Sequence, residues 1–241
     1  MGGAPQTLPL TFPPGSDVVA AGERLVEMDD GPSHYSEWVV PGFHSVAQPP
    51  LMFGDYAEHP VAGSAPPTTV FRASNAPTWG EDMASWMPSI LAFLAEQTGA
   101  TLPYDTLSIV KLPGGWIFPG TVGYGTVYLS DDYGGPSAHY FEETLAHETS
   151  HSWWGVMVGP TDYPTTRWLV EGLATLSQID YAAQHHAGDM PREVYLARRY
   201  REHRGLLQHQ TSPGFPAVAP AGPVEMEGLD DAFWAYIRSS A

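Results

Sequence analysis

The sequence predicts an α+β fold, and three features of its 241 residues predict it. The first quarter alternates short apolar and aromatic pieces with Pro, Gly and Asp and shows no helical period, which is typical of strands. Two β-branched runs follow in the middle of the chain, and later segments repeat apolar residues at steps of three and four. Strands followed by helices indicate a sheet layered against helices.

Composition narrows the classes of protein that the chain can represent. Ten basic side chains against 27 acidic ones give a formal net charge of −17, which repels a phosphate backbone and excludes nucleic acid as a partner. With no cysteine, the chain has no disulfide, no thiolate metal site and no thiol nucleophile. We expect no membrane span and no export signal in this chain, because no long apolar run occurs. These features assign no cellular compartment.

The first elements are expected to be strands and one helix. Residues 1–67 form the β-rich region, in which the small and turn-forming residues 62–67 are a linker candidate. A helix begins after Gly80 and stops at Gly99, since apolar residues recur between them at helical spacing. Two strands follow, with the sequences LSIVKLP (107–113) and GTVYLSDD (125–132).

The second half is expected to be helical. Helices are predicted over residues 137–158, 164–184 and 191–208, and a last one begins at Asp230. The Glu142–Glu143 pair is expected on a solvated helix face, and His185–His186 at the negative end of a helix. No cap or breaker precedes Ala241, so the sequence predicts that the chain ends within an element.

The residues that carry chemistry form an H-E-x-x-H motif, His147-Glu148-Thr149-Ser150-His151. Four residues advance a helix by slightly more than one turn, so both imidazoles project from one face and can reach one metal ion. Glu148 lies beside them, where a carboxylate can take a proton from water. The alternative is a pair of surface histidines that flank a solvated glutamate.

Glu171 is the candidate for the third ligand. It is a lone acidic residue in the otherwise apolar run WLVEGLATL, where a solvated face is a poor explanation. Residues 152–170 separate it from His151, enough for a turn and an antiparallel helix. The sequence therefore predicts a zinc site formed by His147, His151 and Glu171, with water at the fourth position.

Together, HETSHSWWGVMVGP and WLVEGLAT resemble the signature of the zinc gluzincins related to aminopeptidase N and leukotriene hydrolase. That signature has eighteen residues between its second histidine and E-G, whereas this chain has nineteen. The resemblance implies a thermolysin-like zinc metallopeptidase domain over residues 67–241, truncated at its C-terminus. It also implies that residues 1–66 are the end of an N-terminal β-rich domain, and hence that the chain is a fragment with further domains.

The resemblance also implies roles for two more positions in the chain. Family aminopeptidases carry a glutamate on the edge strand that binds the free α-amine of the substrate. Aligning Gly125 of PGTVGYGTVYL with the family pattern places Val122 at that position, which puts aminopeptidase specificity in doubt. Tyr236, followed by Arg238, matches a tyrosine that hydrogen-bonds the tetrahedral intermediate; the alternative is an aromatic residue that only packs on a C-terminal helix.

The leading hypothesis is a zinc-dependent metallopeptidase with a peptide substrate, Zn²⁺ as cofactor, and Glu148 and Tyr236 as catalytic residues. A non-catalytic or degenerate zinc-binding module of a larger, membrane-associated protein is the alternative, favoured by Val122 and by the abrupt C-terminus. Non-peptide hydrolysis such as epoxide opening, which occurs within the family, is a third hypothesis.

Overall fold

The computed structural model describes residues 6–40, 51–73, 80–102, 104–112, 120–130, 138–158, 163–186 and 191–197. Tyr236 and the helix predicted from Asp230 lie outside these ranges. The first seven strands are β1 (Gln6–Phe12), β2 (Asp17–Ala20), β3 (Glu23–Asp30), β4 (Ser33–Val40), β5 (Leu51–Gly54), β6 (Tyr56–Val61) and β7 (Thr68–Ala73). They are followed by α1 (Gly80–Thr98), β8 (Leu107–Leu112), β9 (Gly120–Gly123), β10 (Thr126–Ser130), α2 (Ala138–Ser150) and α3 (Tyr163–His185). The expected α+β fold is confirmed.

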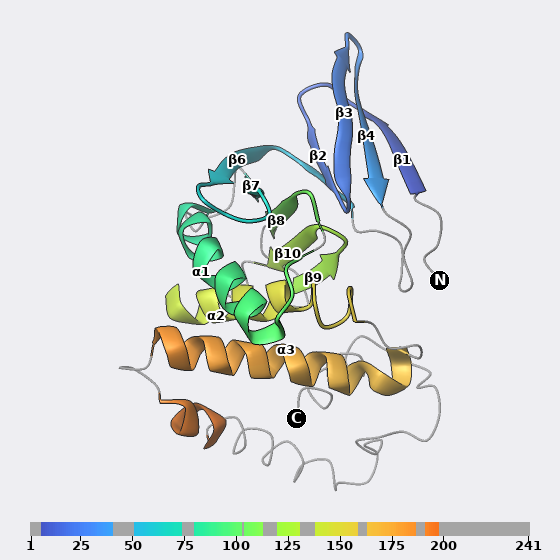
Figure 1. Ribbon diagram of the computed structural model, residues 1–241. Helices are drawn as coiled ribbons and strands as arrows, with labels where there is room; N and C mark the ends of the chain where they lie inside the picture. The colour runs from blue at the N-terminus through green and yellow to red at the C-terminus, as the bar shows by residue number, and fades with distance from the viewer. Residues whose placement is uncertain are drawn as a thin grey trace, which may run out of the picture.

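A five-stranded sheet with the order β6-β7-β8-β10-β9 is the centre of the molecule (Figure 1). The inner strands β7, β8 and β10 are parallel, and the outer strands β6 and β9 are antiparallel to their neighbours. All six residues of β8 are buried, as expected for a parallel strand covered on both faces. Both strands predicted in the middle of the sequence are confirmed as β8 and β10, and β9 forms the edge of the sheet beside β10.

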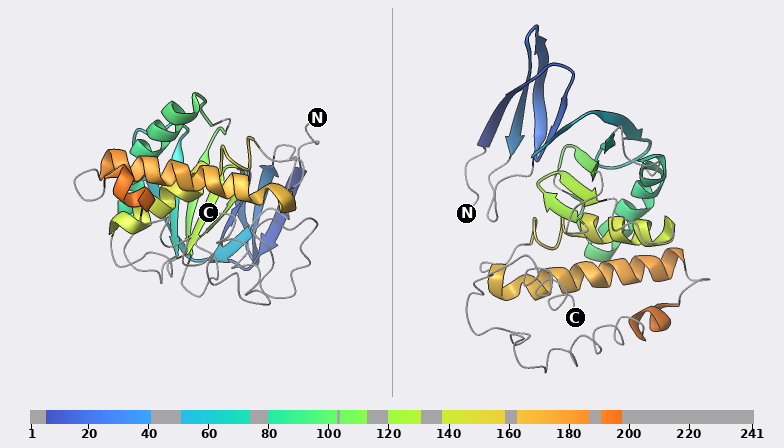
Figure 2. Two further views of the ribbon diagram at one scale, coloured as in Figure 1. Left: turned by 90° about the horizontal axis from the view of Figure 1, so that it is seen from below. Right: turned by 180° about the vertical axis from the view of Figure 1, so that it is seen from behind.

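Helices cover one face of this sheet. The predicted helix after Gly80 is confirmed as α1, which turns its apolar residues into a core shared with β7, β8, β10 and α2. Its end is set by Gly99, whose φ of 69° and N–H bond to the Ala95 carbonyl form a C-cap. Pro88 lies inside the helix. Helix α3 packs along α2 on the side away from the sheet (Figures 1 and 2).

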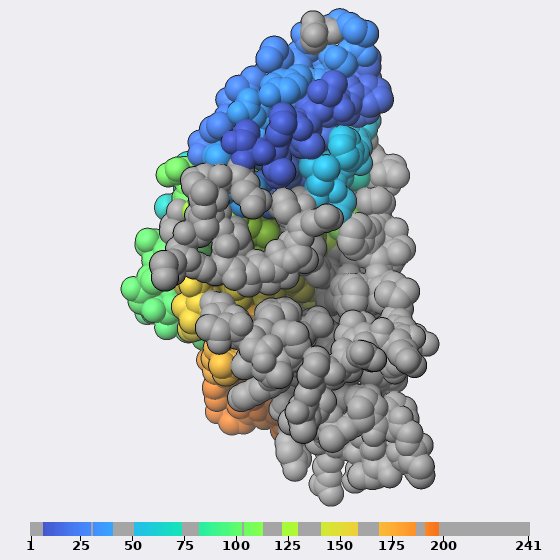
Figure 3. Space-filling model, turned by 90° about the vertical axis from the view of Figure 1, so that its right-hand side faces the viewer, coloured from blue at the N-terminus to red at the C-terminus, as the bar shows by residue number. Residues whose placement is uncertain are grey.

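The N-terminal strands cover the opposite face. Strands β1, β4 and β3 form an antiparallel sheet, and β2 pairs with β5. Side chains of β2 pack there against β7, β8 and β10 in a second core, which contains the buried side chains Phe12, Val18, Val19, Ala20, Trp38, Phe71, Val110, Leu112 and Tyr128. In the space-filling view, the blue N-terminal strands lie at the top, and the yellow to orange residues of the later helices lie in the lower half (Figure 3).

Residues 62–67 connect β6 to β7, which are hydrogen-bonded neighbours in the five-stranded sheet. The division of the chain into domains at residue 66 stays a prediction. Among the described helices, none has the length and hydropathy needed to cross a membrane.

Candidate metal centre

Two antiparallel helices bring the predicted ligands together. Helix α2 carries His147 in its last turn, and His151 follows directly after the helix ends at Ser150. The helical pattern predicted as far as residue 158 is thus interrupted, because residues 151–158 form tight turns. Glu171 comes from the first half of α3, on the face that packs against α2.

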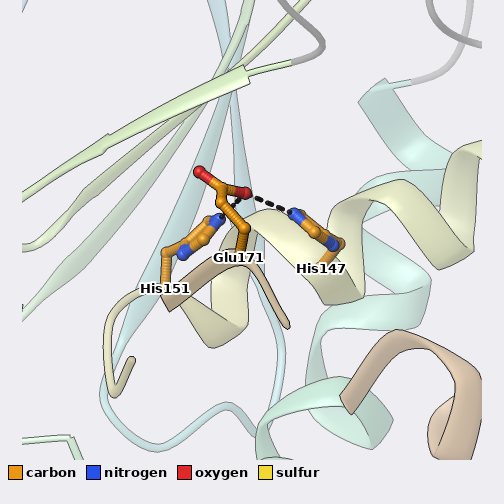
Figure 4. A group of neighbouring side chains, drawn as sticks. All are labelled: His147, His151 and Glu171. Atoms are coloured by element: carbon orange, nitrogen blue, oxygen red, sulfur yellow. Dashed lines mark ion pairs between the residues drawn. The ribbon is translucent and has the colours of Figure 1, made fainter. Parts of the chain in front are cut away.

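One carboxylate oxygen stands between the two imidazoles. The Nε2 atoms of His147 and His151 lie 3.5 and 3.4 Å from Glu171 Oε2. Figure 4 shows both rings pointing at this oxygen from α2 and the turn after it. One ligand atom from each residue lies within 4.8 Å of the others, and within the described ranges this is the one such group of three or more His, Asp or Glu side chains.

These residues fit a zinc ion. His147 is buried, and neither of its ring nitrogens has a hydrogen-bond partner among the described residues. A buried polar atom without a partner is costly, and a metal ion bound to Nε2 would remove that cost at this nitrogen. Two imidazole nitrogens and one carboxylate oxygen form a donor set typical of catalytic zinc.

His151 is held by its second ring nitrogen. Nδ1 lies 3.1 Å from the carbonyl oxygen of Trp154. Since a carbonyl can only accept, Nδ1–H donates, and in the neutral imidazole Nε2 keeps its lone pair for a metal.

The electrostatics of the group reflect its close packing. Burial by itself lowers the pKa of His151, but the Glu171 carboxylate outweighs it and raises that pKa to about 9. Burial acts in the opposite direction on Glu171, yet His151 and His147 together hold its pKa well below the usual range. Without a metal, Glu171 is therefore stabilised as a carboxylate between two imidazoles.

Glu148 lies in α2 between the two histidines in sequence, and only 3% of its surface is exposed. Burial raises its pKa, the two histidines oppose that effect, and Glu171 adds to it. A carboxylate enclosed in this way is suited to exchanging a proton with a water molecule held in the centre.

The Glu142–Glu143 pair contradicts the sequence interpretation. Both side chains are buried rather than solvated. Tyr181 donates to Glu142 Oε1 at 2.6 Å, and Tyr195 donates to Glu143 Oε2 at 2.7 Å. His186 Nε2 also lies 3.1 Å from Glu142 Oε2. The expectation of a solvated face was wrong because the tyrosines that satisfy these carboxylates lie 39 and 52 residues away.

The edge strand β9 contains Val122, which pairs with Val127 of β10 and packs against the core on the helical side of the sheet. The predicted replacement of an acidic residue thus puts an apolar side chain on the face that α2 covers. Sequence reasoning did not single out Gly155 in the turn after α2, because its positive φ is visible only in the structure.

The sheet, its covering helices and the His–His–Glu group form an α+β domain with a candidate metal centre. Two solved M1 zinc metallopeptidases have this fold. A structure from Deinococcus radiodurans matches with a TM-score of 0.67 and 16% identity, over 97% of this chain and 50% of that one. A two-domain enzyme bound to L-arginine matches with a TM-score of 0.61 and 17% identity, over 81% of this chain and 44% of that one.

Curated relatives give the sequence comparison. Aminopeptidase O of Rattus norvegicus is 32% identical over 143 residues, which are 56% of this chain and 17% of the relative. Aminopeptidase O of Mus musculus is 33% identical over 91 residues, 37% of this chain and 11% of the relative. The matches thus span less than a fifth of these relatives and about half of the solved structures. No protein-family model matches the chain.

Proposed function

We propose that this chain carries the centre of a zinc-dependent metallopeptidase, with His147, His151 and Glu171 as the ligands. The observation that carries the proposal is the convergence of their three ligand atoms within 4.8 Å, where His147 and Glu171 are buried and His151 is partly exposed. The likeness to M1 zinc metallopeptidases and to aminopeptidase O supports it, as does the donor set.

In the proposed reaction, Glu148 moves the proton. Bound zinc would polarise the scissile carbonyl and lower the pKa of the attacking water. Glu148 accepts the proton of that water as it adds to the carbonyl carbon, and returns it to the amine nitrogen as the C–N bond breaks. Tyr236 is proposed to hydrogen-bond the oxyanion of the tetrahedral intermediate.

A peptide is the proposed substrate, and Val122 affects whether the site prefers a peptide with a free N-terminus. An apolar side chain cannot compensate a free α-ammonium for the water that it loses on binding. We therefore propose that the chain does not select for a free N-terminus as an aminopeptidase does. Because Val122 removes a contact to the substrate, it also favours the second candidate function, a zinc-binding module that hydrolyses nothing.

Metal content and peptide turnover, measured on one preparation, test the proposal. We expect about one zinc per chain, and hydrolysis of a peptide that stops when a chelator removes the metal and resumes when zinc is restored. Zinc without turnover of either N-acetylated or free-amine peptides would favour the non-catalytic module. Absence of zinc binding would refute both.

A further inference from the structure

The turn after α2 brings a glycine against both helices of the metal centre. Residues 151–158 fold back on themselves: Val156 N–H donates to the His151 carbonyl, and Gly155 N–H to the Val158 carbonyl, both at 3.1 Å. Gly155 has a φ of 133°, a backbone conformation that residues with a side chain rarely adopt. The turn therefore depends on glycine at this position.

One peptide unit of this turn orients the second histidine ligand. The Trp154 carbonyl, which accepts from His151 Nδ1, belongs to the same peptide plane as the Gly155 N–H. That plane is thus held at both ends, by His151 on one side and by Val158 on the other. Its direction fixes the imidazole with Nε2 toward Glu171.

The same glycine touches the helix of the third ligand. A Cβ atom added at Gly155 would lie 3.2 Å from Val170 Cγ1 and 4.0 Å from His151 Nδ1. The first distance is shorter than an ordinary van der Waals contact. Val170 is buried in α3 and directly precedes Glu171, so a shift of the α3 backbone at Val170 would also move the ligand that follows.

We infer that Gly155 is a positioning residue of the metal centre, which sets His151 through the Trp154 carbonyl and Glu171 through its close approach to Val170. This inference rests on the proposed zinc site. Gly155 touches no metal ion itself. Its effect is to let one short turn align two ligands that come from separate helices.

The test is Gly155→Ala in the full chain, with zinc affinity measured by competition against a chelator. Groups that orient metal ligands change metal affinity about 10- to 100-fold when altered, and we expect a loss in this range. The absorption spectrum of the Co²⁺-substituted protein, which reports ligand geometry, should change as well. Gly172→Ala is the matched control: it lies in α3 beside Glu171, and an added Cβ meets nothing within 4 Å. The control should bind zinc as the parent does.

Several outcomes would overturn the inference. A Gly155→Ala variant that binds zinc within about threefold of the parent, with the parental Co²⁺ spectrum, would show a structural role only, even if its melting temperature falls. If that variant does not fold, Val170→Ile is the second test. It adds a methyl group at the same contact and keeps glycine at position 155, so the backbone there is not strained. Unchanged zinc affinity in that variant would also contradict the inference. If the parent binds no zinc, the proposed function itself fails, and the inference fails with it.

Discussion

Replacing Glu148 with Gln separates proton transfer from metal binding. The amide has nearly the shape of the carboxylate, and the substitution removes no atom of His147, His151 or Glu171. The variant should therefore retain zinc. It should lose hydrolysis, because a neutral amide cannot accept the proton of the attacking water.

The size of the loss follows from the position of the side chain. A general base contributes about 10²- to 10⁴-fold to a rate. Glu148 is 3% exposed, so bulk water has little access to replace the missing base. We expect the upper half of that range, about 10³- to 10⁴-fold in kcat, or about 4 to 5.5 kcal/mol at 1.36 kcal/mol per factor of ten.

The assay compares kcat and zinc content for the parent, Glu148→Gln and Glu143→Gln, on a peptide that the parent cleaves. Glu143 is a matched control, since it is a buried glutamate of the same helix whose carboxylate accepts from Tyr195. Its variant should keep most of the activity. A Glu148→Gln protein that retains zinc and stays within tenfold of the parent would remove Glu148 from the role of base.

Three further predictions concern the metal, the substrate and the helix packing. His147→Ala or Glu171→Ala should reduce bound zinc strongly from about one per chain, and elemental analysis that finds undiminished zinc in both would exclude the assigned ligands. Because Val122 gives an ammonium no partner, kcat/KM for a free-amine peptide should exceed that of its N-acetyl form by less than about a hundredfold, or 2.7 kcal/mol; a larger ratio would point to another acidic group. Tyr181→Phe removes the hydroxyl that lies 2.6 Å from buried Glu142 and 3.0 Å from Ser89, and should lower the free energy of unfolding by about 1.5–3 kcal/mol, measured by urea denaturation; an unchanged midpoint would show that these hydrogen bonds add no net stability.

Local spacing explains what the sequence could predict. Both histidines lie four residues apart, and a lone glutamate in an apolar run is conspicuous, so the sequence alone could single out the three side chains that the structure brings together. The strand at 107–112 was equally visible as a β-branched run. Each of these signals is contained within a few consecutive residues.

Contacts between distant segments explain what the sequence could not predict. Glu142 and Glu143 have the composition of a solvated face, and only the approach of Tyr181 and Tyr195 makes their burial tolerable. The arrangement of the N-terminal strands was likewise hidden, because β1 pairs with β4 and β2 with β5 across intervening residues. A local sequence pattern does not indicate which distant strand will pair with which.

The second core has a practical consequence for anyone who shortens this chain. Strand β2 covers Tyr128 and Val110 of the central sheet, and Gly22 N–H donates to the Tyr124 carbonyl, in the turn between β9 and β10. A polypeptide started at residue 67 would turn that apolar face toward water and release the turn beside the edge strand. Its aggregation, or a loss of activity, would then report on the missing strands rather than on the metal chemistry.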